Sequence, residues 1–160
     1  MSTNSFIGII EHNVLKGIYC HADGYPAFNG KMLNEYYKND SKIYKLIDLG
    51  FIYSLGKYVS PYERQTHNFE YRQENVVLAY GRDRGEKNVE AVEFQNVKAF
   101  KDFIKNSFIR YIYIRYNHEW YVVKQINNKT IDLIKLVEVL ENTNKEIGSY
   151  KEFKRIKLNN

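Results

Sequence analysis

Cysteine, proline and long apolar runs are scarce in this chain of 160 residues, and each scarcity excludes something. The single cysteine, Cys20, excludes an internal disulfide and is compatible with a reducing compartment. Only 2 prolines argue against a disordered chain. No apolar run reaches the roughly 18 residues that a membrane-spanning helix needs, and the first residues do not resemble a signal peptide. We therefore expect a cytoplasmic protein that makes no use of a membrane.

Aromatic residues, in contrast, are abundant, and most of them carry a polar hydroxyl: the chain has 15 Tyr, 9 Phe and 1 Trp. Its 24 Lys and Arg outnumber its 19 Asp and Glu, which gives a net charge of +5. This excess excludes a protein that mimics DNA over its whole surface, and it permits contact with the phosphates of nucleic acids or nucleotides. The basic residues are scattered along the chain, so the excess can equally serve solubility alone.

Alternating strand-like and helix-like segments predict one α+β domain over residues 1–160, with a mainly antiparallel sheet and about four helices packed on it. Runs of β-branched and aromatic residues mark the strands. We expect strands at Ser5–Glu11, Lys16–His21, Val76–Tyr80, Ala91–Gln95, Phe108–Tyr116 and Trp120–Lys124. The first two and the last two are expected to form hairpins, and Val76–Tyr80 to be a central strand.

Apolar residues at helical spacing predict the helices. We expect them at Phe28–Lys38, from a Ser41 cap to Gly50, after an Asn96 cap, and at Thr130–Glu141. Three segments have no helical pattern: Phe51–Asn75, a long loop with a short strand near Phe69–Tyr71; Gly81–Glu86, a charged loop; and Lys145–Lys157, a tail or terminal strand. Long loops inside a compact domain are often functional.

The first candidate site is the segment Tyr19–Pro26, which holds a thiol, an imidazole and a carboxylate: Cys20, His21 and Asp23. Joined by His67 and His118 from elsewhere in the chain, these groups would suit a metal centre or a nucleophilic Cys/His pair. However, adjacent residues of a strand point to opposite faces, and no second cysteine is present. The simpler interpretation makes Cys20 a small buried residue and places His21 with Asp23 in a hydrogen-bonded turn. We expect no metal, no cofactor and no catalytic residue.

The second candidate site is the segment Gly81–Glu86, in which Arg82 and Arg84 lie between two glycines. Their planar guanidinium groups would suit a phosphate or a carboxylate, and the glycines would let the backbone approach a ligand. Asp83 and Glu86 would instead neutralise both arginines if the segment is purely structural. The segment matches neither a phosphate-binding P-loop nor a dinucleotide-binding glycine motif.

The third feature is the alternation of tyrosine, isoleucine and arginine in Arg110–Tyr116. Exposed tyrosine and arginine side chains suit base stacking or a protein interface. We predict as interface residues Tyr111, Tyr113, Arg115 and Trp120. The alternative is an ordinary half-buried strand whose tyrosine hydroxyls reach water.

The stretch Gly17–Pro26 (GIYCHADGYP), followed by Gly30, Leu33 and Tyr36-Tyr37, resembles the opening of a family of small phage and prophage proteins with the pattern IYCHxDGYPxxxGxxLxxYY. The resemblance continues at Lys45–Gly50, Ser54–Gly56 and Leu78–Glu86 (LAYGRDRGE). It covers a motif-bearing part of about residues 5–90 and leaves the C-terminal part, about residues 96–160, unmatched. The chain departs from the pattern at Ala22, where the family often has an aromatic residue.

This resemblance implies a mobile-element origin and an accessory role in an infected bacterium, but it attaches no reaction to the chain. We therefore expect a phage-encoded, non-enzymatic counter-defence protein in the cytoplasm of the bacterial host. Its target would be a protein of bacterial immunity, as for an anti-CRISPR protein, or a nucleotide immune signal that it sequesters. Homodimerisation is compatible with either role.

If the target is a nucleotide, Arg82 and Arg84 would hold phosphate while Tyr25 or Tyr80 stacks on the base, with His21 and Asp23 close by. If it is a protein, the hairpin Tyr111–Trp120 would be the contact surface. Two alternatives stay open. One is a small metal-dependent hydrolase or nuclease that uses Cys20, His21, Asp23 and His67, and the other is a basic nucleic-acid-binding protein.

Overall fold

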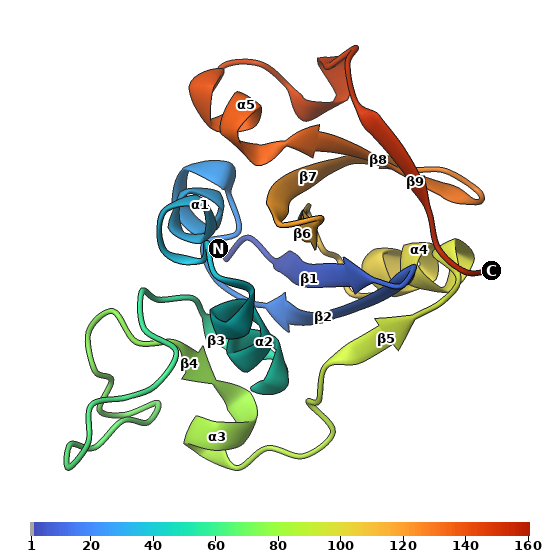
Figure 1. Cartoon of the computed structure of the whole chain (residues 1–160). Helices are drawn as coiled ribbons and strands as arrows, with labels where there is room; N and C mark the ends of the chain where they lie inside the picture. Colours follow the sequence, from blue (N-terminus) through green and yellow to red (C-terminus); the bar gives the residue numbers. More distant parts are fainter. Residues whose placement is uncertain (1) are drawn as a thin grey trace.

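One nine-stranded sheet organises the computed structural model, which describes residues 2–160 (Figure 1). The strands are β1 (Ser5–Glu11), β2 (Val14–Cys20), β3 (Ile52–Ser54), β4 (Leu78–Ala79), β5 (Val92–Phe94), β6 (Tyr111–Tyr116), β7 (Glu119–Ile126), β8 (Thr130–Lys135) and β9 (Lys154–Lys157). Their order is β4-β3-β2-β1-β6-β7-β8-β9, and β5 also pairs with β2. Only the pairs β1/β6 and β2/β3 are parallel in this sheet. The predicted α+β fold with a mainly antiparallel sheet is confirmed.

Five α-helices accompany the sheet in the described residues: α1 (Lys31–Tyr36), α2 (Asp40–Asp48), α3 (Tyr80–Arg84), α4 (Val97–Asn106) and α5 (Leu136–Glu141). A π-helical turn, η1 (Pro26–Gly30), precedes α1, and a 3₁₀ turn, η2 (Ile147–Ser149), follows α5. The predicted Asn96 cap is confirmed, since its side chain accepts from the Ala99 amide at 3.0 Å. Ser41 is not a cap; instead its amide donates to the capping side chain of Asn39 at 2.8 Å. No helix among residues 2–160 is long and apolar enough to cross a membrane.

The two faces of the sheet bury separate apolar clusters, because side chains alternate along each strand. On one face, Ile7 and Ile9 of β1 pack in a cluster with Leu33 of α1 and Leu46 of α2. On the other face, Phe6 of β1 packs in a second cluster with residues of α4, β6, β8 and β9. The first cluster holds α1, α2 and α5 against the sheet, and the second fills the inside of its curve.

The end of the chain returns to the first hairpin. The Asn159 amide donates to the carbonyl of Asn13 at 3.0 Å, and the Asn160 amide donates to the carbonyl of Gln95 at 2.8 Å. β9 is the last strand on one side of the sheet, so these bonds bring that side back toward its centre. Figure 1 shows the curl, with β9 running down toward α4 and β5.

The expectation of one helix at Thr130–Glu141 is wrong, because the segment divides into β8 and α5. Ile131 and Leu133 fit either a helical or an alternating pattern, and both are buried. Pairing decides the outcome: β8 lies between β7 and β9, with Ile131 opposite Ile126 on one side and Ile156 on the other. Two hydrogen-bonded neighbours outweigh a local helical preference.

The region between β3 and α3 also differs from expectation. Phe69–Tyr71 forms no strand. Of the expected central strand only Leu78–Ala79 joins the sheet, at its edge, and Val76 forms an isolated parallel bridge with Tyr58. The expected loop Gly81–Glu86 begins inside α3, and Gly85 ends that helix with φ +71°. Glycine favours this left-handed C′ position because it has no Cβ.

A buried carboxylate between β8 and β9 predicts a pH dependence of stability. Asp132 is 1% exposed, and Arg155 donates to both of its oxygens at 2.8 and 3.1 Å. Hydrogen bonding by this guanidinium holds the pKa of Asp132 below its ordinary value. In the unfolded chain this carboxyl titrates at about 3.9. The stabilisation by the Asp132–Arg155 pair is therefore complete above that pH and is lost as the pH falls through the lower pKa of the folded state.

We therefore expect Asp132→Asn to lower the stability at pH 7 and to flatten its decline below about pH 4. Urea unfolding of the native protein and of Asp132→Asn at pH 7 and pH 3 measures how steeply the free energy of unfolding of each one falls with pH. The exposed Asp102→Asn is the control, because its carboxylate pairs only with Lys98 on the surface. Equal slopes for the native protein and Asp132→Asn would contradict the assignment.

Candidate functional site

The cysteine weighed as an alternative nucleophile or metal ligand is inaccessible. Cys20 is 0% exposed, and its thiol lies 3.4 Å from the side-chain nitrogen of the buried Asn29. Burial raises the pKa of this thiol to about 12. Because only the thiolate is an effective nucleophile or metal ligand, Cys20 is a core residue at physiological pH.

The other groups of the first motif do not form a metal centre. His21 Nδ1 lies 3.0 Å from the Tyr19 hydroxyl, and its ring lies 5.2 Å from the ring of Tyr53. Asp23 is exposed, with φ +57°, and its carbonyl accepts from the Asn29 amide. Within residues 2–160, no group of three or more His, Cys, Asp and Glu side chains is placed to hold a metal ion.

His67 is part of a structural network rather than an open site. Its Nδ1 accepts from the Gln73 amide at 2.9 Å, so Nε2 carries the proton and donates to the Val77 carbonyl at 2.9 Å. Nε2 also lies 3.5 Å from Asp83 Oδ2, and both side chains are almost fully buried. With both ring nitrogens bonded, His67 offers neither a free base nor a metal ligand.

Arg82 belongs to the same network. Its guanidinium donates to the carbonyls of Val59 and Val77 at 2.6 and 2.7 Å, and to Asp83 at 2.9 Å. Asp83 in turn accepts from the Ala79 amide at 2.8 Å. We call His67, Arg82 and Asp83 the loop latch, since together they tie both ends of the long loop to α3. Arg82, one of the two arginines that the sequence assigned to a phosphate, is therefore used to hold this loop.

Beside the loop latch lies a cluster that we call the arginine–aromatic surface: Tyr53, Phe69, Arg72, Tyr80 and Arg84. The rings of Phe69 and Tyr80 stack at 5.7 Å, and Tyr53 meets them edge-on at 5.8 and 6.3 Å. The Arg84 guanidinium lies 4.2 Å from the centre of the Phe69 ring, and that of Arg72 lies 4.9 Å from Tyr53. Stacked rings and guanidinium groups at these distances attract each other electrostatically.

The charges of this surface are only partly compensated. Arg84 pairs with Glu86 at 2.7 Å, yet half of its side chain stays exposed. Arg72 is exposed and pairs with no carboxylate within residues 2–160. Burial raises the pKa of Tyr80 to about 12, so its phenol is neutral and can donate a hydrogen bond at neutral pH.

The two sequence motifs meet at this surface, although not by all their residues. The ring of Tyr53 lies between His21, at the end of β2, and Tyr80, at the start of α3. Tyr25 is elsewhere, with its ring centre 5.6 Å from that of Tyr111. The structure therefore brings Tyr80 and Arg84 together with His21, and separates all three from Tyr25.

Most of the hairpin expected as an interface is core. Tyr113 is 0% exposed, Trp120 4% and Arg115 6%. The Trp120 indole donates to the Tyr37 carbonyl at 2.8 Å, which ties β7 to the end of α1. These three side chains are buried on the sheet face covered by helices, and only Tyr111 of the predicted set is partly exposed.

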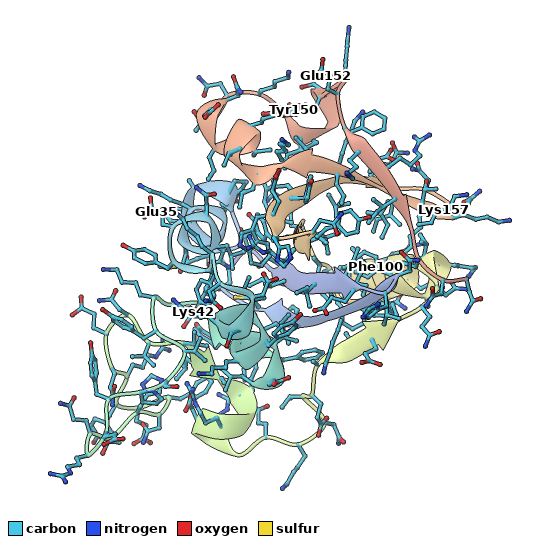
Figure 2. All side chains as sticks on the ribbon, in the orientation of Figure 1. Glu35, Lys42, Phe100, Tyr150, Glu152 and Lys157 are labelled. Carbon is cyan, nitrogen blue, oxygen red and sulfur yellow. The ribbon has the colours of Figure 1, made fainter. Side chains whose placement is uncertain are left out.

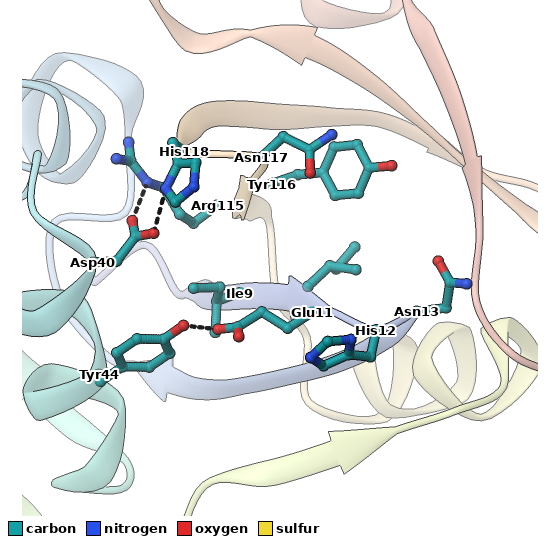
Figure 3. Close-up of a pocket in the computed structure, with 11 residues that line it drawn as sticks. Ile9, Glu11, His12, Asn13, Asp40, Tyr44, Arg115, Tyr116, Asn117 and His118 are labelled. Carbon is teal, nitrogen blue, oxygen red and sulfur yellow. Dashed lines mark hydrogen bonds and ion pairs between the residues drawn. The ribbon is translucent and has the colours of Figure 1, made fainter.

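A polar pocket of about 350 Å³ was not foreseen from the sequence (Figure 3). Asp40 at the start of α2 accepts from Arg115 at 3.0 Å and meets His118 Nδ1 at 2.6 Å. Tyr44 donates to Glu11 across the pocket. An imidazole held by a carboxylate resembles a general base, but no Ser, Thr, Cys or Lys lines the pocket to act as a nucleophile.

The signal for this pocket lies in two turns with histidine in the left-handed region. His12-Asn13 and Asn117-His118 all have positive φ, which identifies the two residues of each tight hairpin turn. Because β1 and β6 are parallel neighbours, the turn that follows β1 and the turn that follows β6 lie side by side at the same end of these strands. That pairing is not visible in the sequence.

Comparisons with known proteins supply no relative: no protein family, curated protein or solved structure matches this chain.

Proposed function

We propose that this chain is a phage-encoded counter-defence protein that acts by binding a protein of the bacterial immune system. The observation that carries the proposal is the meeting of both phage-like motifs at one exposed patch, the arginine–aromatic surface. The groups that a Cys/His enzyme would need have structural roles instead, because Cys20 is buried in the core and both ring nitrogens of His67 are bonded in the loop latch.

The composition of the patch favours a protein partner over a phosphate-rich one. Tyrosine and arginine are enriched where protein interfaces gain most of their binding energy. A two-arginine phosphate grip is not available, because Arg82 donates to backbone carbonyls while Arg84 pairs with Glu86. The remaining free guanidinium, on Arg72, would suit a carboxylate on the partner.

The test is a plaque assay in a bacterium that carries one defence system at a time and expresses this protein. We expect the native protein to restore plaque formation against at least one system. Phe69→Ala combined with Arg84→Ala should abolish the rescue, because truncating such anchors costs about 2 kcal/mol or more of binding each. Co-elution of the purified protein with the purified immune component would show that the effect is direct.

The matched control combines Tyr62→Ala with Lys101→Ala, which removes an exposed ring and an exposed cation that do not belong to the arginine–aromatic surface. Circular dichroism must show that both double variants are folded. Full rescue by the folded Phe69/Arg84 variant would refute the proposed contact surface.

A further inference from the structure

A second concave site lies on another part of the molecule. It is a groove of about 580 Å³ between η1, the start of β6 and the loop after α5. This volume is within the range of small-molecule sites, which is roughly 300–1,000 Å³. We call it the tyrosine groove; the residues of its lining that matter here are Tyr25, Phe28, Arg110, Tyr111, Asn142 and Asn144.

One wall of the tyrosine groove is aromatic and exposed. Tyr25 is 38% exposed and Phe28 is 58% exposed, and their ring centres lie 6.4 Å apart. The turn that carries both rings is held from below by Asn29, which is 3% exposed and donates to the Ala22 carbonyl at 2.9 Å. Tyr111 extends the wall at 5.6 Å from Tyr25. The exposed rings of Tyr25 and Phe28 are thus carried by a turn that a buried side chain holds, and the ring of Tyr111 lies beside them.

The cation of the groove is Arg110. Its guanidinium lies 5.6 Å from the centre of the Tyr25 ring and 6.0 Å from that of Tyr111, and it donates weakly to the Tyr25 hydroxyl at 3.4 Å. Within residues 2–160 no carboxylate forms an ion pair with it. A guanidinium over exposed rings and without an anion is complementary to an anionic ligand that has a flat face.

The opposite wall is the polar loop after α5. Asn142, Thr143 and Asn144 place amide and hydroxyl groups along the groove, and Lys145 adds a cation whose ammonium lies over Tyr150. The acidic residue of the lining beside them is Glu146. A purely apolar ligand would cover the Arg110 guanidinium without giving it an anion, which disfavours such a ligand.

We propose that the tyrosine groove binds a nucleoside monophosphate, either free or as one unit of a longer nucleotide. The base would lie against Tyr25 and Phe28, the phosphate would meet Arg110, and the Asn142–Asn144 loop would meet the polar edges of the base or the ribose. One unpaired arginine matches one phosphate. This site does not depend on the arginine–aromatic surface, so the two proposals stand or fall separately.

The test is isothermal titration of the full chain with AMP, GMP, CMP and UMP, and separately with adenosine and with inorganic phosphate. We expect at least one monophosphate to bind, and adenosine and phosphate alone to bind more weakly. The same titration with a short single-stranded RNA tetranucleotide distinguishes the sources: tighter binding of the tetranucleotide indicates a unit in a strand, and tighter binding of the monophosphate indicates a free nucleotide.

Two variants locate the binding. Arg110→Gln should weaken every monophosphate by about tenfold or more, because it removes the contact to the shared phosphate. Phe28→Ala should weaken purines more than pyrimidines, since stacking depends on ring area. The matched controls, Arg64→Gln and Tyr71→Ala, remove an exposed guanidinium and an exposed ring outside the groove and should change nothing.

The proposal is overturned if no monophosphate and no tetranucleotide binds at millimolar concentration. It is also overturned if binding survives both Arg110→Gln and Phe28→Ala in folded protein. Loss of nucleotide binding in Arg84→Ala, with Arg110→Gln unchanged, would place the nucleotide on the arginine–aromatic surface and would refute the tyrosine groove.

Discussion

Replacing Asp83 by alanine is expected to lower the free energy of unfolding by about 2–3 kcal/mol and to release the loop between β3 and β4. The Asp83 side chain is 3% exposed and accepts from the Ala79 amide and the Arg82 guanidinium. Its removal leaves a buried donor without a partner and a guanidinium without its anion. Buried hydrogen bonds to charged groups are the costly ones to lose.

The loop rather than the core should respond first. Limited proteolysis should cut the Asp83→Ala variant near Tyr62–Gln65, where the chain is exposed, and hydrogen exchange should speed up at the Val77 amide, which donates to the Tyr58 carbonyl. Glu86→Ala is the control, because Glu86 pairs with Arg84 on the surface. Equal protease resistance in the two variants would show that the loop latch does not hold the loop.

The loop latch also gives a physical reason for the sequence motif around α3. Arg82 and Asp83 look like ligand-binding groups in the sequence because both are charged and lie beside glycines. In the structure they bond to each other and to backbone groups of Val59, Val77 and Ala79. The same contacts fix the position of Phe69 by fixing the loop that carries it. If the proposed function holds, Asp83→Ala should therefore also reduce the restoration of plaque formation, although Asp83 itself does not contact the partner.

Local signals predict the parts of this fold that depend on local chemistry. The two hairpins β1–β2 and β6–β7 follow from alternating apolar residues around short polar turns, and α4 follows from its Asn96 cap. Gly50, with φ +79°, occupies the left-handed position expected after α2. Each of these features is decided by a few neighbouring residues.

Features that depend on distant pairing are not predictable in this way. β8 is a strand because β7 and β9 lie on either side of it, although its apolar spacing also fits a helix. β4 is an edge strand because, among the strands of the described residues, β3 alone pairs with it. The parallel pairing of β1 with β6 places Arg115 beside Asp40, an ion pair that joins residues far apart in sequence.

The structure groups the candidate residues differently from the sequence hypotheses. Tyr25 and Tyr111 came from two separate hypotheses, and the structure places them side by side with Arg110, which belongs to the Arg110–Tyr116 alternation but was not among the predicted interface residues. Tyr80 and Arg84 were expected together, and they are together. However, Phe69, which contacts both, and Arg72, which contacts Tyr53, come from the loop that offered no regular pattern. Irregular segments carry side chains whose neighbours only the folded chain defines.

Phe100→Ala is expected to be the most destabilising single truncation proposed here, at about 3–5 kcal/mol. Phe100, labelled in Figure 2, is 0% exposed, and its ring lies 5.2 Å from Phe6 and 5.3 Å from Phe94. These contacts join α4 to β1 and β5. The cavity left by the missing ring would therefore lie between this helix and these two strands, inside the curl of the sheet. Phe6 cannot fill the space by itself, because Gly8 and Gly17 already pack against its ring.

Thermal unfolding followed by circular dichroism should show a midpoint lower by about 6–20 °C, since 1 kcal/mol corresponds to about 2–4 °C for a domain of this size. Phe103→Ala is the control: it removes the same ring from the same helix at a half-buried position and should cost clearly less. Equal losses for the two variants would contradict the assignment of Phe100 as the ring that anchors α4 to β1 and β5.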